Sequence, residues 1–118
     1  MDITQKLEQF RELIEFQQHE HYLASYKNPE FAEIQAKRDS ETRVKVGRKY
    51  ANIDVGQSGK YMVELATGEI YGIKAYGVIH RGHHYGNLDT IYNWDWSGYV
   101  AIQRTMAQEA AIGFRQSA

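Results

Sequence analysis

The chain of 118 residues contains no cysteine and only one proline. Without cysteine the protein has no disulfide bond and no thiolate metal site, and the redox state of its compartment stays undetermined. No run of about 18 apolar residues occurs, and the N-terminal segment MDITQKLEQF is too polar for a signal peptide. We therefore expect a cytosolic protein.

The residues that are present describe one globular domain. Hydrophobic residues make up 42% of the chain and charged residues 25%, which excludes a disordered or fibrous protein. A chain of this size buries roughly two-thirds of its unfolded surface, which is enough for one core. We expect a single α+β domain with a helical part over 1–40, a β part over 41–103, and a short helix or tail over 104–118.

The net charge of −1 conceals an uneven distribution of charge. Residues 1–42 carry five basic and nine acidic side chains, whereas residues 43–92 carry seven basic and four acidic ones. A basic middle segment is typical of one that meets an anion. Attraction between the two parts within the fold explains the asymmetry equally well.

The first part of the chain has helical periodicity. A capping box formed by Asp2 and Gln5 predicts where the first helix begins. If that helix runs over 3–26, it is about 36 Å long and overhangs a small domain, so a partner or a twin chain would cover it. The alternative is a break near 18–21 and a return onto the core. Apolar residues recur at helical spacing at Ile3, Leu7, Phe10 and Ile14.

A second, shorter helix is predicted over 29–39. Asn28 suits the N-cap position, and Pro29 suits the first helical position, where its missing N–H costs nothing. Phe31 and Ile34 are expected to face inward.

From residue 43 onward the apolar side chains alternate, which predicts β-strands. The alternation over 43–46 resumes on shifted parity over 51–55, which predicts a β-bulge near Gly47. The next two runs, over 61–65 and 70–73, are joined by a tight turn in which Gly68 supplies a positive φ angle. Residues 77–87 form a loop rich in glycine and histidine, and further strands are expected over 88–96 and 98–103.

These segments predict helices packed on a small, twisted, mostly antiparallel sheet of four or five strands that curls toward a half-barrel. Helices followed by strands favour an α+β fold over an alternating α/β fold.

Three motifs invite a chemical interpretation. The stretch over 56–60 resembles a nucleotide-binding loop, but only two residues separate its glycines and Tyr61 follows Lys60, so a plain β-turn explains it. His80, His83 and His84 are close enough in sequence for two of them to share a metal ion. A glycine-rich loop lacks the rigid spacing of a metal site, so we expect no metal and no cofactor. A histidine beside Arg81 would suit metal-free or metal-assisted cleavage of a phosphodiester.

The densest pattern interleaves basic and aromatic side chains in the middle segment. Cations neutralise phosphates while ring faces stack on unpaired bases. The same residues would also suit a small core with a solvated face, or a protein-binding surface. We predict that the sheet and its loop bind a partner through Arg48, Lys49, Lys60, Lys74, Tyr76, Arg81, His83, His84, Tyr85, Trp94 and Trp96.

Four stretches carry a resemblance: GKYMVE at 59–64, TGEIYGIKAYGVIH at 67–80, HYG at 84–86 and LDT at 88–90. With them, residues 43–99 resemble small, functionally uncharacterised proteins of bacteriophages and related mobile elements. The resemblance implies a small cytosolic protein made during infection that acts on host machinery or defence by occupying a surface. It implies no catalytic role.

We therefore predict a non-catalytic protein that binds an anionic partner, either nucleic acid or an acidic protein surface, with no membrane partner. Two alternatives stay open. One is a histidine-dependent phosphodiesterase or nuclease. The other is a module that blocks a protein through its long helix, which would also suit a homodimer.

Overall fold

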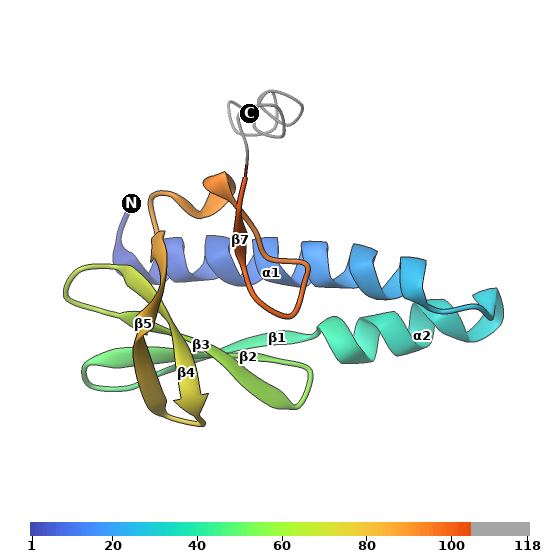
Figure 1. Cartoon of the computed structure of the whole chain (residues 1–118), viewed down its shortest axis with the longest axis horizontal. Coiled ribbons are helices and arrows are strands. Elements are labelled where there is room, and N and C mark those ends of the chain that lie inside the picture. The colour runs from blue at the N-terminus through green and yellow to red at the C-terminus, as the bar shows by residue number, and fades with distance from the viewer. Residues whose placement is uncertain (105–118) are drawn as a thin grey trace.

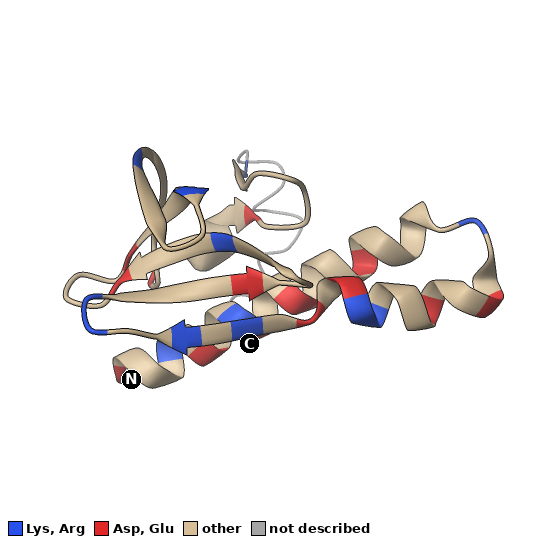
Figure 2. Ribbon diagram, turned by 90° about the horizontal axis from the view of Figure 1, so that it is seen from below, with Lys and Arg blue, Asp and Glu red and all other residues tan. Residues whose placement is uncertain are grey.

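A helical hairpin and an antiparallel sheet form the part of the chain that the structure describes, residues 1–104 (Figure 1). In this computed structural model, helices α1 (Ile3–Ser25) and α2 (Pro29–Ser40) precede all the strands. The predicted α+β fold is confirmed. The first half of α1 lies along the sheet, whereas its second half and α2 project beyond the sheet (Figures 1 and 2).

Helix α1 is uninterrupted, so the alternative with a break near residue 18 is wrong. The predicted capping box is confirmed, because the Asp2 carboxylate accepts the N–H of Gln5 and the Gln5 side chain accepts the N–H of Asp2. The side of α1 that faces the sheet is apolar, as its spacing predicted. Its last buried residue is Gln18, so the final two turns are less closely covered than the first half. The other buried residues of α1 are Leu7, Phe10 and Ile14.

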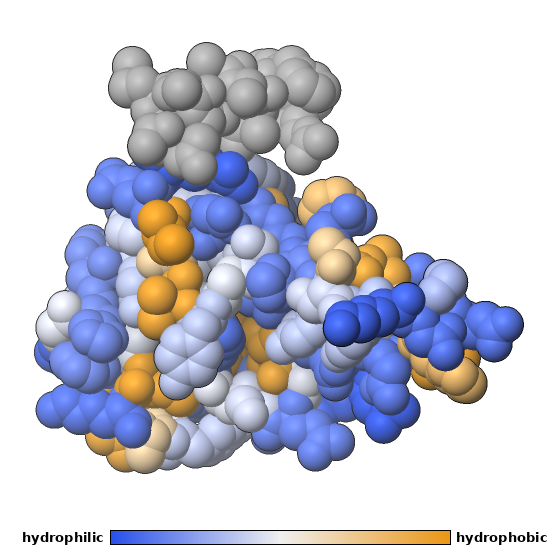
Figure 3. All heavy atoms as spheres, turned by 45° about the vertical axis from the view of Figure 1, so that its right-hand side comes forward, coloured by the Kyte–Doolittle hydropathy of each residue, from blue (hydrophilic) through white to orange (hydrophobic). Residues whose placement is uncertain are grey.

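Helix α2 begins as predicted, with the Asn28 side chain accepting the N–H of Glu30 and Pro29 in the first turn. The predicted inward positions of Phe31 and Ile34 are wrong, since these side chains are 59% and 62% exposed. Small side chains face α1 instead, because they let two helices approach closely. Hydrophobic side chains (orange) therefore reach the surface of the projecting helical end (Figure 3). The buried residues of α2 are Ala32, Ala36 and Ser40.

Each strand of the main sheet pairs with its neighbour in the chain, in the antiparallel order β1-β2-β3-β4-β5, and the sheet is not closed. The predicted turn between the third and fourth strands is confirmed, with a φ angle of 78° at Gly68. The strands are β1 (Thr42–Val46), β2 (Tyr50–Val55), β3 (Ser58–Glu64), β4 (Glu69–Ala75) and β5 (Val78–Asn87).

Two predictions for the sheet are wrong. Val46 pairs with Ala51 across a turn, so the change of parity near Gly47 comes from reversal of the chain, not from a bulge. The register shift lies between Ile53 and Asp54. Residues 78–87, expected as a loop, form the edge strand β5, whose pairing with β4 is interrupted by register shifts. Such irregularities are how a strand accommodates glycine.

The segment after β5 folds back onto α1. The strands predicted over 88–96 and 98–103 are reduced to a 3-10 helix, η1 (Ile91–Asn93), and two short paired strands, β6 (Trp94–Asp95) and β7 (Ile102–Gln103). The short helix or tail expected over 104–118 lies, except for Arg104, outside the described residues.

Aromatic rings join the helix, the sheet and the returning segment in one core. The ring of Trp96 lies 4.7 Å from that of Phe10 and 5.2 Å from that of Tyr61, in edge-to-face geometry. The Trp96 indole N–H donates to the carbonyl of Ile91. The buried Gln18 amide donates to the backbone carbonyls of Trp96 and Gly98, so α1 holds this segment in place.

Candidate functional site

The basic side chains are dispersed over the turns and edges of the sheet and over the helices (Figure 2). Arg48 and Lys49 lie in the turn between β1 and β2, next to the end of β3 that carries Glu64. Lys60 lies near the opposite end of β3. The structure therefore does not bring these three predicted binding residues together.

Two further predicted binding residues have partners within the sheet. The Arg81 guanidinium lies 3.3 Å from a carboxylate oxygen of Glu64, and it also donates to the Tyr50 hydroxyl. His84 Nε2 lies 2.8 Å from Glu69 Oε2. Both side chains are therefore engaged by carboxylates of the sheet, Arg81 by one on β3 and His84 by one on β4.

The predicted aromatic residues differ in exposure. Trp96 is fully buried, so the prediction that it contacts a partner is wrong. Tyr85 and Trp94 are half-buried, with their rings 5.7 Å apart. Tyr76 is exposed, and its hydroxyl donates to the Asp54 carboxylate. The predicted aromatic residues are thus divided between the core and the surface.

Three predicted residues, Lys60, His83 and Tyr85, do meet at one place, a cleft of about 460 Å³. The sheet forms one wall through β3, β4 and β5. Helix α1 contributes Tyr22, and the segment after β6 contributes Tyr99 and Val100. We call this the Lys60 cleft. Its volume lies within the usual range of small-ligand sites, roughly 300–1,000 Å³.

Lys60 is the cation of this cleft. Its ammonium nitrogen lies 5.3 Å from the centroid of the Tyr99 ring, and partial burial lowers its pKa below the ordinary value of lysine. Within residues 1–104, no carboxylate lies within ion-pair distance of this nitrogen. Because a partly buried cation is stabilised by a nearby negative charge, the cleft is suited to an anionic group.

Tyrosine hydroxyls add polar groups to the same cleft. Tyr61 is 2% exposed, and its hydroxyl has no hydrogen-bond partner in the described part of the chain. Burial raises the pKa of Tyr61 and, to a smaller extent, that of Tyr85, so both phenols stay protonated at neutral pH. A protonated phenol donates as well as accepts, but the Tyr61 hydroxyl is itself buried, so it lies beneath the surface of the cleft.

A glycine keeps the sheet wall of the cleft open. A Cβ atom at Gly72 would lie 3.0 Å from the Cβ of His83 and 3.4 Å from Cε2 of Tyr85. A larger residue at this position would therefore press against two side chains that line the cleft.

The three histidines predicted as a cluster do not all lie together, because the register of β5 on β4 shifts between His80 and His84. The rings of His80 and His83 stack at 3.9 Å with an interplanar angle of 8°, whereas His84 approaches Glu69 and the Tyr71 ring. Of the three, only His83 lines the Lys60 cleft. In the described ranges, no group of three or more His, Asp or Glu side chains is placed to hold a metal ion.

Sequence reasoning missed Tyr22 and Tyr99. Both are tyrosines outside the basic segment, 77 residues apart in the chain, and they meet because the segment after β6 docks on α1. The excess of tyrosine in the composition was the only signal that pointed to them, and it carries no information on position.

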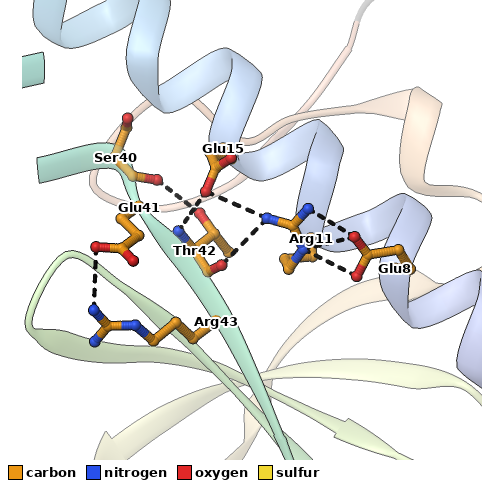
Figure 4. Close-up of polar contacts among 7 residues, drawn as sticks. All are labelled: Glu8, Arg11, Glu15, Ser40, Glu41, Thr42 and Arg43. Carbon is orange, nitrogen blue, oxygen red and sulfur yellow. Dashed lines mark hydrogen bonds and ion pairs between the residues drawn. The ribbon is translucent and has the colours of Figure 1, made fainter. Parts of the chain in front are cut away.

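A polar cluster at the junction of α1, α2 and β1 tests the idea that the acidic helices neutralise the basic segment (Figure 4). Arg11 pairs with Glu8 and Glu15 of its own helix, and Glu15 accepts the backbone N–H of Thr42. Within residues 1–104, the only ion pair between an acid of 1–42 and a base of 43–92 joins Arg43 to Glu41. Direct ion pairs between the acidic helices and the basic segment are therefore few, and they do not explain why the two parts of the chain carry opposite net charge.

The fold and this site define an α+β protein with a lysine-containing, tyrosine-lined cleft. Comparisons with protein families, curated proteins and solved structures found no match for the chain. The resemblance to bacteriophage proteins accordingly stays a prediction. Among the described residues, no helix is both long and apolar enough to cross a membrane.

Proposed function

We propose that the protein is a non-catalytic binding protein that holds single-stranded nucleic acid at the Lys60 cleft. The observation that carries this proposal is a partly buried ammonium group, without a carboxylate partner in residues 1–104, in a cleft lined by tyrosine rings. A phosphate would supply the missing negative charge, and bases would stack on the rings.

The aromatic lining favours nucleic acid over an acidic protein surface. Tyr99 is 91% exposed, so one ring face is accessible while Lys60 lies near the ring. A base stacked on Tyr99 would bring its phosphate within reach of the ammonium group. An acidic peptide would use the charge of Lys60 but would gain little from the rings. The resemblance to bacteriophage proteins supports a partner in the host cell.

A histidine-dependent phosphodiesterase has less support. Such a reaction needs a general base and a general acid, here a pair of histidines, on opposite sides of one phosphate. His83 stands in the cleft with Lys60, but its stacking partner His80 does not line the cleft, and Arg81 is engaged by Glu64.

The test is binding of fluorescently labelled single-stranded DNA and RNA, followed by anisotropy at several salt concentrations. Replacement of Lys60 by methionine (Lys60→Met) keeps the length of the side chain and removes the charge. Loss of one charge-assisted contact should weaken binding roughly tenfold. It should also lower the slope of log affinity against log salt concentration by about one, the share of a single phosphate contact. Lys74→Met is the matched control, because Lys74 is an exposed lysine of the same sheet that does not line the cleft.

Equal affinity of Lys60→Met and the wild-type protein would overturn the proposal, as would binding that does not respond to salt. Binding of a polyglutamate peptide that competes with the oligonucleotide, with no preference for bases, would assign the cleft to an acidic protein surface instead.

A further inference from the structure

We infer that the exposed side of α2 joins two copies of this chain in an antiparallel, twofold-symmetric pair. This inference is independent of the Lys60 cleft. The surface involved, which we call the α2 stripe, consists of five exposed residues: Glu30, Phe31, Ile34, Lys37 and Arg38.

The α2 stripe is one side of a helix. Its members recur at intervals of three, four and seven residues, which places them on the side opposite Ala32 and Ala36, the residues that pack toward α1. Phe31 and Ile34 are neighbours on this side, and each is more than half exposed. Both belong to α2, which projects beyond the sheet (Figure 1), and both stay exposed in the described part of the chain. Adjacent apolar side chains of this size at a projecting surface are typical of an interaction site.

The order of charges along the stripe identifies the occupant. An acidic residue, Glu30, stands at its N-terminal end, the apolar pair lies in the middle, and Lys37 and Arg38 stand at its C-terminal end. Rotation of a second α2 by half a turn about an axis through Ile34 sets Glu30 opposite Arg38 of the second copy, and Ile34 opposite its own equivalent. A surface that complements itself in this way is what a twofold interface requires. Parallel packing would instead set like charges against each other.

A groove beside the stripe provides room for the aromatic ring. It has a volume of about 780 Å³, and it is lined by Ile34, Lys37 and Arg38 of α2 and by Glu15 and His19 of α1. In the antiparallel arrangement, Phe31 of the second copy comes opposite Lys37 and thus lies at this groove. The apolar contacts at the centre and the charge pairs at both ends together form a small interface of the kind that associates reversibly.

The test is sedimentation velocity of the full-length chain over a wide range of protein concentration. We expect a reversible monomer–dimer equilibrium. Ile34→Glu sets two carboxylates against each other on the twofold axis and should raise the dissociation constant at least roughly tenfold. Val46→Glu is the matched control, because Val46 is equally exposed, at 66%, but lies on β1, and it should leave the equilibrium unchanged. Far-UV circular dichroism verifies that both variants are folded, as expected for substitutions of exposed side chains.

A charge exchange distinguishes the antiparallel pair from other associations. Arg38→Glu alone sets two acids against each other at both ends and should weaken the dimer. Combination with Glu30→Arg restores opposite charges across the twofold axis and should recover most of the lost affinity. The inference is overturned if the wild-type chain is monomeric throughout, if Ile34→Glu dimerises like the wild-type chain, or if the combined variant is no better than Arg38→Glu.

Discussion

At the scale of single residues, Lys60 is a side chain whose requirements for binding and for stability oppose each other. Burial lowers its pKa, so the charged form is less stable in the folded protein than in the unfolded chain. This cost is fully present at pH values below the pKa in the folded state. It disappears as the pH rises through the ordinary pKa of lysine, about 10.4.

Lys60→Met should therefore raise the free energy of unfolding at about pH 7, and this gain should vanish near pH 10.4, where the wild-type lysine is itself becoming neutral. Urea denaturation at both pH values measures the difference. Lys74→Met, at an exposed position, should change stability little at either pH. A Lys60→Met protein that is less stable than the wild type at neutral pH would show that the ammonium group is already stabilised by contacts within the chain.

At the scale of elements, the helical hairpin is fixed to the sheet at one polar junction. The Glu15 carboxylate of α1 accepts the backbone N–H of Thr42 at 2.8 Å, and it also pairs with Arg11 (Figure 4). Thr42 is 3% exposed, so its N–H has little access to water if Glu15 is lost. The start of β1 is thus tied directly to the middle of α1.

Glu15→Ala should therefore destabilise the protein by about 1–3 kcal/mol, the usual cost of a buried polar group left without a partner. Chemical denaturation measures the loss. Glu12→Ala serves as control, because Glu12 is an exposed carboxylate one turn earlier on the same helix, and its removal should cost less than about 0.5 kcal/mol. Equal losses in the two variants would mean that the Thr42 contact adds nothing to stability.

At the scale of the whole molecule, the Lys60 cleft exists because the segment after β6 docks on α1. Gln18 makes this contact through hydrogen bonds to the carbonyls of Trp96 and Gly98. Tyr99 and Val100, which form one wall of the cleft, follow directly. The wall is therefore positioned by a residue that does not itself line the site.

Gln18→Leu should leave two carbonyls without their donor and loosen this wall without disturbing the sheet. Hydrogen exchange should accelerate over residues 96–101 and stay unchanged over β2 and β3, and oligonucleotide binding should weaken with it. Ser25→Ala, near the exposed end of α1, is a suitable control. Uniform acceleration of exchange across the chain would contradict a local role for Gln18.

The sequence predicts features that depend on neighbouring residues and fails where distant contacts decide. The capping box of Asp2, the Asn28-Pro29 start and the Gly68 turn are local, and all three are confirmed. Phe31 faces outward because a short helix can pack with either side, and close approach to α1 favoured the alanines. The glycines of β5 interrupt the alternation of apolar residues in the sequence, so the segment was expected as a loop. In the structure, pairing with β4 keeps it a strand. Lys60, His83 and Tyr85 were predicted as binding residues, but their common cleft depends on the tertiary fold.

The order of the strands also has a kinetic consequence. A sheet in which every strand adjoins its successor along the chain forms through contacts of short range, and such topologies fold rapidly. The bond from Gln18 to the carbonyl of Trp96 instead spans 78 positions. Its closure carries a larger entropic penalty, so we expect it to come late in folding and to reverse most readily afterwards. Transient release of this contact, together with the bonds from Gln18 to Gly98 and from Trp96 to Gln17, would loosen the wall of the cleft while the meander stays intact.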